Sequence, residues 1–241
     1  MKSSQHPFYG IEDAIVELGH PETIWYRGHA GEHRLLPMIY RFPRGAENER
    51  RMVERYQQHP SDPHVKTSKQ GLTMLIAMHH SYLPTRLLAW TESLNVALFC
   101  ALTRASRPTV FVLDPVKLNK YSEIAGIVKL DSYTQTGFEF LPWSTESMLS
   151  RYPIAIDGRS TEPEMVRTEG IFTLHGTSEL PLEEQCSECV KKIVLTEEEK
   201  FLAEEGILSG RWIYAANYHS DSYASKQAQG PTTTVNGELP R

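Results

Sequence analysis

Residues 83–100 read LPTRLLAWTESLNVALFC and mix apolar runs with an arginine, a tryptophan, two threonines and a glutamate. Pro84 followed by Thr85 is typical of a helix start, and in such a helix Arg86 and Trp90 would lie one turn apart. A structural contact between arginine and aromatic ring would then explain both residues. The other interpretation is a turn that holds a ligand, and the residues alone leave both open.

Around this stretch, the apolar pattern alternates between helical and strand periods. Helices are predicted for residues 11–18, 45–58, 69–80, 93–105 and 196–207, and strands for residues 23–28, 107–115, 152–157, 170–176 and 191–195. Thr196 and Glu199 have the spacing of a capping box at the last of these helices. The order predicts an α+β fold, a single domain with a central mixed or split β-sheet flanked by helices.

The same pattern gives the expected organisation along the chain. We expect an N-terminal helix in residues 1–19, the α+β domain in residues 20–215 and a polar tail in residues 216–241. The tail is rich in glycine, proline and threonine, a composition that indicates disorder.

Composition narrows the class of protein. The net charge of the 241 residues is −5, so there is no general basic surface for binding nucleic acid through phosphates alone. No apolar run is long enough to cross a bilayer, and the N-terminus lacks the core of a signal peptide. We therefore expect a cytoplasmic protein with no membrane contact.

The cysteines and histidines give little support for a metal site. Three cysteines make a disulfide framework improbable, and Cys186 and Cys189 form a lone CxxC without the second ligand pair that zinc needs. His79 and His80 are adjacent and would point to different faces of a helix. No metal is predicted.

The motif WYRGH at residues 25–29 places Arg27 and Gly28 at the end of a predicted strand. Arg27 is either an exposed arginine at a turn or a clamp for phosphate or carboxylate, because a guanidinium presents a planar fork of donors to paired oxygens. In the second case, Gly28 would let a ligand approach the backbone.

Four motifs occur in a fixed order, and together they resemble a known family. They are WYRG (25–28), LLPMIYR (35–41), HSYLPTRLLAWTES (80–93) and GIFTLHG (170–176). This set resembles the FRG domain of bacterial and phage-borne proteins, over roughly residues 20–176. Tyr26 replaces the phenylalanine of the Phe-Arg-Gly motif, and Ala89 stands where an aspartate is typical. The resemblance implies a toxin or phage-defence effector, with an antitoxin or inhibitor as a partner.

A second, weaker resemblance is to ADP-ribosyltransferases of the arginine–serine–glutamate class. These enzymes have an arginine, often in Tyr-Arg-Gly, at the end of the first strand, then a Ser-Thr-Ser strand leading into a helix, then a glutamate on a late strand. Here the matching residues are Arg27, then Thr91 and Ser93, then Glu169, although the first serine of the middle motif is missing. The resemblance implies an ADP-ribosyltransferase-like fold and NAD as co-substrate.

The chemistry of that reaction fits these residue types. Cleaving the nicotinamide–ribose bond develops positive charge on the ribose, which a carboxylate stabilises while an arginine holds the diphosphate. Arg27 and Glu169 are the expected catalytic residues, with Glu92 as the rival acid. The residues expected to bind NAD are Arg27, Gly28, His80, Thr85, Arg86, Trp90, Thr91 and Ser93. The acceptor would be a macromolecule, such as a base of DNA or RNA.

A function of another class is also open. In a non-catalytic nucleotide- or phospholigand-sensing domain, Arg27, His80 and Arg86 would line a pocket for a phosphorylated ligand. NAD or a nucleotide would then raise the melting temperature without being consumed.

Overall fold

The computed structural model describes residues 8–58, 71–103, 107–130, 151–159 and 170–208 of the chain. In chain order, the elements are α1 (Tyr9–Glu17), β1 (Trp25–His29), the 3-10 helix η1 (Met38–Arg41), α2 (Gly45–Gln57), α4 (Gly71–His80), β2 (Leu87–Trp90), α5 (Leu94–Leu102), β3 (Thr109–Leu113), α6 (Pro115–Lys120), β4 (Val128–Lys129), β5 (Ile154–Asp157), β6 (Ile171–Leu174), α8 (Leu182–Gln185), β7 (Val190–Val194) and α9 (Glu197–Leu208).

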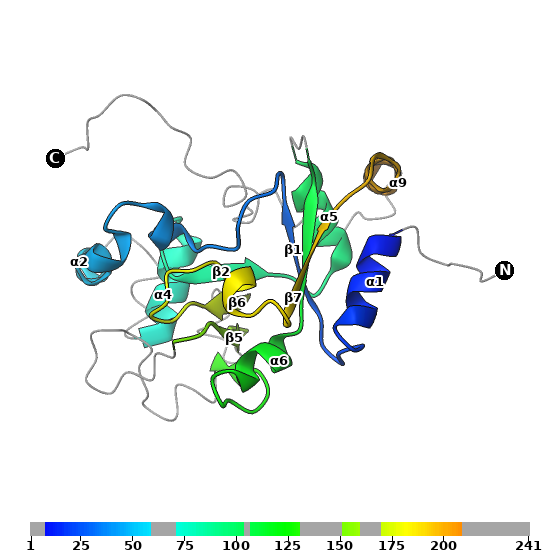
Figure 1. Cartoon of the computed structure of the whole chain (residues 1–241). Coiled ribbons are helices and arrows are strands. Elements are labelled where there is room, and N and C mark those ends of the chain that lie inside the picture. The colour runs from blue at the N-terminus through cyan, green and yellow to red at the C-terminus, as the bar shows by residue number, and fades with distance from the viewer. Residues whose placement is uncertain (1–7, 59–70, 104–106, 131–150, 160–169, 209–241) are drawn as a thin grey trace.

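The strands of the described residues form two sheets, so the sheet is split rather than continuous. One sheet has three antiparallel strands in the order β1-β3-β7. The other has four strands in the order β2-β6-β5-β4, in which only β4 and β5 are parallel. Figure 1 shows the strands of the two sheets running in crossing directions. The α+β class was predicted from the sequence, and a split sheet was one of the two predicted alternatives, mixed or split.

Helices cover the outer face of each sheet. The three-stranded sheet packs on one face against α1, α5 and α9, with Ala97, Val110 and Val112 among the buried residues. The four-stranded sheet packs against α4 and α2 through residues such as Met78 and Phe172. Figure 1 places these two groups of helices at opposite ends of the molecule.

The inner faces of the two sheets meet in a further buried cluster. It contains Trp25 and Phe111 from one sheet and Leu88, Trp90 and Ile171 from the other. Alternate residues of a strand point to opposite faces, so the odd-numbered residues of β1 point toward this space between the sheets. Arg27 therefore points toward the space between the sheets.

Most predicted elements are present, and the helix bounds agree closely. Val53 and Tyr56 are buried on α2, as its apolar spacing predicts. The capping box of α9 is confirmed: the Glu199 backbone N–H donates to Thr196 Oγ1 at 3.2 Å, and the Thr196 N–H donates to Glu199 Oε2 at 2.9 Å. The helix after Ser93 is also confirmed, with Ser93 as its N-cap.

The suggested helix start at Pro84 and Thr85 is wrong. Residues 87–90 are strand β2, which pairs with β6 from Leu87–Leu174 to Trp90–Ile171. Arg86 and Trp90 are therefore not one helical turn apart. The strand forms because a partner strand more than eighty residues away supplies backbone hydrogen bonds that a local pattern does not reveal.

The tail at residues 216–241 lies outside the described residues. Within the described part of the chain, none of the helices has the length and apolar character that crossing a bilayer requires.

Candidate functional site

Arg27 is buried in the middle of β1, with 4% of its surface exposed. Its Nε donates to Nε2 of His29 at 2.8 Å, and its Nη1 donates to the backbone carbonyl of Ala89 on β2. The interpretation of Arg27 as an exposed arginine at a turn is therefore wrong. These two acceptors belong to different sheets.

Gly28 faces the opposite side of β1, toward helix α5. A Cβ at this position would lie 1.8 Å from the carbonyl oxygen of Ala97 and 2.7 Å from the backbone nitrogen of Ala101. Backbone atoms of α5 thus fill the place of a side chain, and glycine is required for this close packing. The structure gives Gly28 a packing role and places α5, rather than open space, against it.

The three-stranded and the four-stranded sheets are joined by backbone hydrogen bonds beside Arg27. The Tyr26 N–H donates to the Thr91 carbonyl at 2.7 Å, and the Thr91 N–H donates to the Tyr26 carbonyl at 2.9 Å. Together with the bond from Arg27 to Ala89, this bridge brings the WYRGH motif against the end of β2. Two of the three motif regions predicted from the sequence therefore come together.

Thr91 and Ser93 organise the turn between β2 and α5. The Thr91 hydroxyl oxygen accepts from the Ser93 N–H at 3.1 Å. The Ser93 hydroxyl oxygen accepts from the Val96 N–H at 3.4 Å and caps α5. These bonds satisfy free N–H groups of the first helical turn, and Ser93 remains exposed at the surface.

Glu92, the rival acid, lies in an exposed ion-pair network. Its Oε2 is 2.8 Å from Nη1 of Arg159, whose Nη2 is 2.8 Å from Oδ2 of Asp157. The hydrogen bonds that Arg159 donates to Asp157 and then to Glu92 raise the pKa of Arg159. The network joins the ends of β2 and β5.

Glu169 lies outside the described residues, so its side chain is not located. The chain resumes at Gly170, and β6 begins at Ile171, which pairs with Trp90. The described backbone therefore returns beside β2 directly after position 169.

Arg86 is held by a carboxylate. Its Nε donates to Glu49 Oε1 at 2.8 Å, its Nη2 also bonds Glu49, and its Nη1 donates to the carbonyls of His175 and Gly176 at 3.2 and 3.0 Å. Both side chains of the ion pair are buried. Burial alone would lower the pKa of Arg86, but the hydrogen bond and charge of Glu49 outweigh it and raise the pKa. This geometry ties α2 to the sheet.

Three further residues of the predicted site contact other side chains of the fold: Trp90, Thr85 and His80. Trp90 is buried between the sheets, and its indole N–H donates to the Thr173 hydroxyl at 3.0 Å. The Thr85 hydroxyl is 3.1 Å from Nδ1 of His79. The His80 ring packs edge-on against Phe172 with centroids 6.2 Å apart.

The sequence of this region matches a known family. Residues 22–109 match the FRG domain. We refer to these matched residues as the FRG domain. The match runs from just before β1 to the first residue of β3, so it contains both buried arginines, Thr91 and Ser93. No curated protein and no solved structure matches the chain significantly.

The family match is shorter than the resemblance found from the motifs. It ends at residue 109, so it does not include GIFTLHG at residues 170–176 or Glu169. The strand β6 that carries GIFTLHG nevertheless pairs with β2 of the FRG domain. A strand outside the matched residues is therefore part of the same sheet as β2.

Sequence reasoning missed two residues that hold the buried arginines of the FRG domain. His29 lies two residues after Arg27, which puts both side chains on one face of a strand, and this spacing was a usable signal. Glu49 lies in the charged run GAENERR, which is typical of a solvated helix face. Its pairing with Arg86 spans 37 residues and leaves no local sign.

The cysteines differ from expectation. Cys186 and Cys189 form a disulfide between α8 and β7, although the cysteine count made disulfides improbable. Both are buried in the core between the sheets. Among the described residues, there is no group of three or more histidine, cysteine or acidic side chains arranged to hold a metal ion.

One surface hollow lies elsewhere on the molecule. It has a volume of about 260 Å³ and is lined by Phe99, Leu102 and Thr103 of the α5 region and by Glu204 and Ile207 of α9. None of the predicted site residues lines it.

Proposed function

We propose that the protein is a NAD-dependent ADP-ribosyltransferase that acts on a macromolecule. One observation carries the proposal. Arg27 donates to the carbonyl of Ala89, 62 residues away, while Tyr26 and Thr91 exchange backbone hydrogen bonds. This contact supports a shared site for the arginine motif and the Thr-Glu-Ser motif.

The proposed roles follow from the chemistry of the nicotinamide–ribose bond. As the bond breaks, nicotinamide leaves and positive charge develops on the ribose. In this proposal, the guanidinium of Arg27 binds the diphosphate. Thr91 and Ser93 lie at the ribose side, and a carboxylate stabilises the cation and orients the attacking group.

Glu169 is the first choice for that carboxylate, and Glu92 is the second. Glu92 already binds Arg159, so using it as the acid would mean breaking an ion pair. Glu169 precedes the strand that pairs with β2. Trp90 is left out of the NAD-binding residues in this proposal, because its ring is packed in the core and its N–H is bonded to Thr173.

The acceptor in this proposal is a macromolecule such as DNA, RNA or a protein, and the setting is a bacterial or phage toxin or defence effector. An antitoxin or inhibitor would be its partner. The net charge of −5 gives a nucleic-acid acceptor no direct support, so the acceptor is decided by experiment.

The test uses the full chain with NAD labelled in the nicotinamide and with protein, RNA and DNA acceptors in parallel. We expect nicotinamide release, and a loss of roughly 100- to 1,000-fold in Arg27→Gln, by analogy with removal of a donor to developing charge. Glu169→Gln should lose activity similarly, and Glu92→Gln should retain it. Arg50→Gln, on the exposed face of α2, is the control arginine. Intact NAD with every acceptor would refute the proposal.

The sensing alternative uses the same experiment with another outcome. If NAD or a nucleotide raises the melting temperature and no cleaved product forms, the domain binds without catalysis. Arg86 would contribute little to such a pocket, because Glu49 and two carbonyls already occupy its guanidinium. Arg27 would then be the main anion-binding residue.

A further inference from the structure

Cys186 and Cys189 lie in the turn between helix α8 and strand β7, and their sulfurs are bonded to each other. Their Cα atoms are 5.5 Å apart, within the usual range for a disulfide. The Cys189 N–H also donates to the Cys186 carbonyl at 3.1 Å. Because this backbone bond closes the same turn without the sulfurs, we expect the two thiols to stay within reach of each other after reduction.

The position of the disulfide in the chain favours a bond that opens and closes over one that supports the whole fold. The two cysteines are separated by only three positions, and a disulfide contributes less to stability as the loop that it closes becomes shorter. Cys100, the third and last cysteine of the chain, lies on α5 in a different buried cluster and is not part of a disulfide. After reduction, Cys186 and Cys189 therefore have only each other as a nearby cysteine.

Helix α8 is attached to the three-stranded sheet through this turn. The helix has four residues, Leu182–Gln185, and is too short to be stable through its own hydrogen bonds. At its end, the Cys186 N–H donates to the Leu182 carbonyl at 2.9 Å. On the other side of the turn, the Cys189 carbonyl accepts from the Asp114 N–H at the end of β3, also at 2.9 Å. The disulfide thus ties a short helix to the strands β3 and β7.

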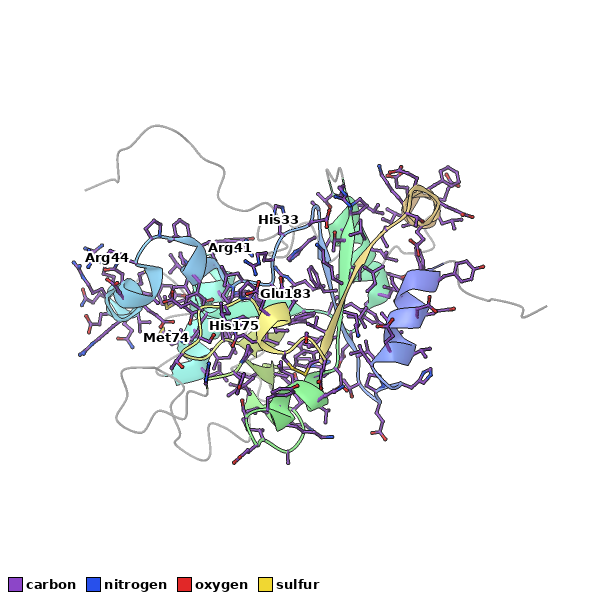
Figure 2. The ribbon with its side chains drawn as sticks, in the orientation of Figure 1. His33, Arg41, Arg44, Met74, His175 and Glu183 are labelled. Atoms are coloured by element: carbon purple, nitrogen blue, oxygen red, sulfur yellow. A yellow bond between two sulfur atoms is a disulfide. The ribbon has the colours of Figure 1, made fainter. Side chains whose placement is uncertain are left out.

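Helix α8 in turn holds the segment that follows β1, through Leu35. The Leu182 N–H donates to the Leu35 carbonyl at 3.0 Å, and the Leu35 N–H lies 3.2 and 3.1 Å from the two carboxylate oxygens of Glu183. The Leu35 side chain is fully buried in the same cluster as the two cysteines. Figure 2 shows Glu183 on the side of α8 that faces the segment with His33. Both backbone polar groups of Leu35 are therefore bonded to α8.

We propose that the Cys186–Cys189 disulfide is a reversible redox bond that controls how firmly α8 holds Leu35 and the segment of residues 30–36. With the bond formed, α8 stays packed and the segment after β1 is fixed. With the bond reduced, the short helix opens more often and releases Leu35. The proposal concerns this part of the fold alone and does not depend on any reaction with NAD.

The bond forms by exchange with a small disulfide such as oxidised glutathione. The thiolate of one cysteine attacks a glutathione sulfur, so that a mixed disulfide forms and one glutathione thiolate leaves. The thiolate of the other cysteine then attacks the protein sulfur of the mixed disulfide and expels the second glutathione. The two protein thiols lose two electrons and two protons, which the small disulfide gains as it becomes two thiols. Both cysteines are buried, so exchange in the folded chain requires α8 to open first.

The first experiment measures the redox equilibrium of the full chain. Oxidised and reduced protein are each incubated in glutathione buffers of increasing thiol-to-disulfide ratio, quenched with acid, unfolded and alkylated, and the labelled thiols are counted by mass. We expect one labelled thiol, that of Cys100, in oxidising buffers and three in reducing buffers, with the same midpoint from both starting states. Three labelled thiols in every buffer, one in every buffer, or a midpoint that depends on the starting state would overturn the proposal.

The second experiment compares amide hydrogen exchange in the oxidised and the reduced wild-type chain. The amides of Leu35 and Leu182 should exchange roughly 10- to 30-fold faster after reduction, whereas the Glu199 amide in the capping box of α9 should not change. The double variant Cys186→Ala, Cys189→Ala should show the faster exchange with and without reductant, and the control Cys100→Ala should keep the difference. Equal exchange of Leu35 and Leu182 in both forms contradicts the proposal. The same holds if reduction accelerates Glu199 equally, because the bond would then support the whole fold.

Discussion

Among the described residues of the FRG domain, Arg27 and Arg86 are the two buried arginines, and they differ in the partners that hold them. Arg86 is bound by the carboxylate of Glu49 and by two backbone carbonyls. Arg27 is oriented by an imidazole and by one carbonyl from the other sheet. Both arginines come from sequence motifs that resemble ligand-binding motifs, and both side chains are at most 4% exposed.

The ion pair with Glu49 identifies Arg86 as a structural arginine. A carboxylate that contacts two guanidinium nitrogens neutralises the charge and uses the fork that a phosphate would need. We therefore assign Arg86 to the stability of the fold, while Arg27 is the arginine that binds the diphosphate in the proposed function.

The largest expected effect comes from breaking the ion pair of Arg86. Glu49→Ala leaves a buried, uncompensated charge and should lower the free energy of unfolding by about 3–5 kcal/mol, measured by urea denaturation. Glu54→Ala is the control, because Glu54 pairs with Arg50 on the same helix but at the surface. That control should cost less than about 1 kcal/mol. Equal costs for the two variants would show that Arg86 is not the structural arginine.

The second effect concerns the backbone that carries Arg27. Gly28→Ala would place a Cβ 1.8 Å from the Ala97 carbonyl, so strand and helix must separate. We expect a loss of about 3 kcal/mol in unfolding free energy, at the upper end of typical overpacking costs. Gly31→Ala is the control, since its Cβ meets only the His33 ring at 3.4 Å. If Gly28→Ala has the stability of the wild type, strand β1 and helix α5 are not as closely packed at Gly28 as the distance indicates.

A third effect tests the histidine beside Arg86 through pH. The folded-state pKa of His175 is about 3, and an unfolded histidine has a pKa of about 6.5. Below about pH 6.5 the unfolded chain binds the additional proton, so stability falls as the pH decreases. Between pH 7.5 and pH 5, His175 should account for about 2 kcal/mol of that fall. His175→Leu should reduce the difference between the two pH values by this amount; an unchanged difference would contradict the buried neutral ring.

The smallest effect is expected for a third arginine, which is exposed. Arg159 bridges Glu92 and Asp157, and about half of its side chain is accessible. Arg159→Gln should change the unfolding free energy by less than about 1 kcal/mol, and added salt should diminish the change. If Arg159→Gln lowers the unfolding free energy as much as Glu49→Ala does, burial does not explain why the two ion pairs differ in their contribution to stability.

The sequence was sufficient for features that depend on neighbouring residues. The capping box of α9, the helix after Ser93 and the strand that carries Arg27 all have local signals, and all are confirmed. The α+β class followed from the order of these elements.

Features set by distant partners were not predictable in the same way. Residues 87–90 form a strand because β6 pairs with them, and Glu49 is buried because Arg86 lies opposite it. The convergence of Arg27 with Thr91 depends on contacts between two sheets, for which the family resemblance was the only indication. The position of His29 was within reach of the two-residue period of a strand, since it follows Arg27 by two residues.

The most direct test of the account compares Arg27→Gln with Arg86→Gln in two assays, nicotinamide release from NAD and urea denaturation. Arg27→Gln should remain folded, with about 1–2 kcal/mol lost for its hydrogen bonds, and should lose nicotinamide release at least about 100-fold. Arg86→Gln should lose about 3–5 kcal/mol, because Glu49 is left buried without its partner. Active Arg27→Gln, or a fully stable Arg86→Gln, would contradict the assignment of function to one arginine and structure to the other.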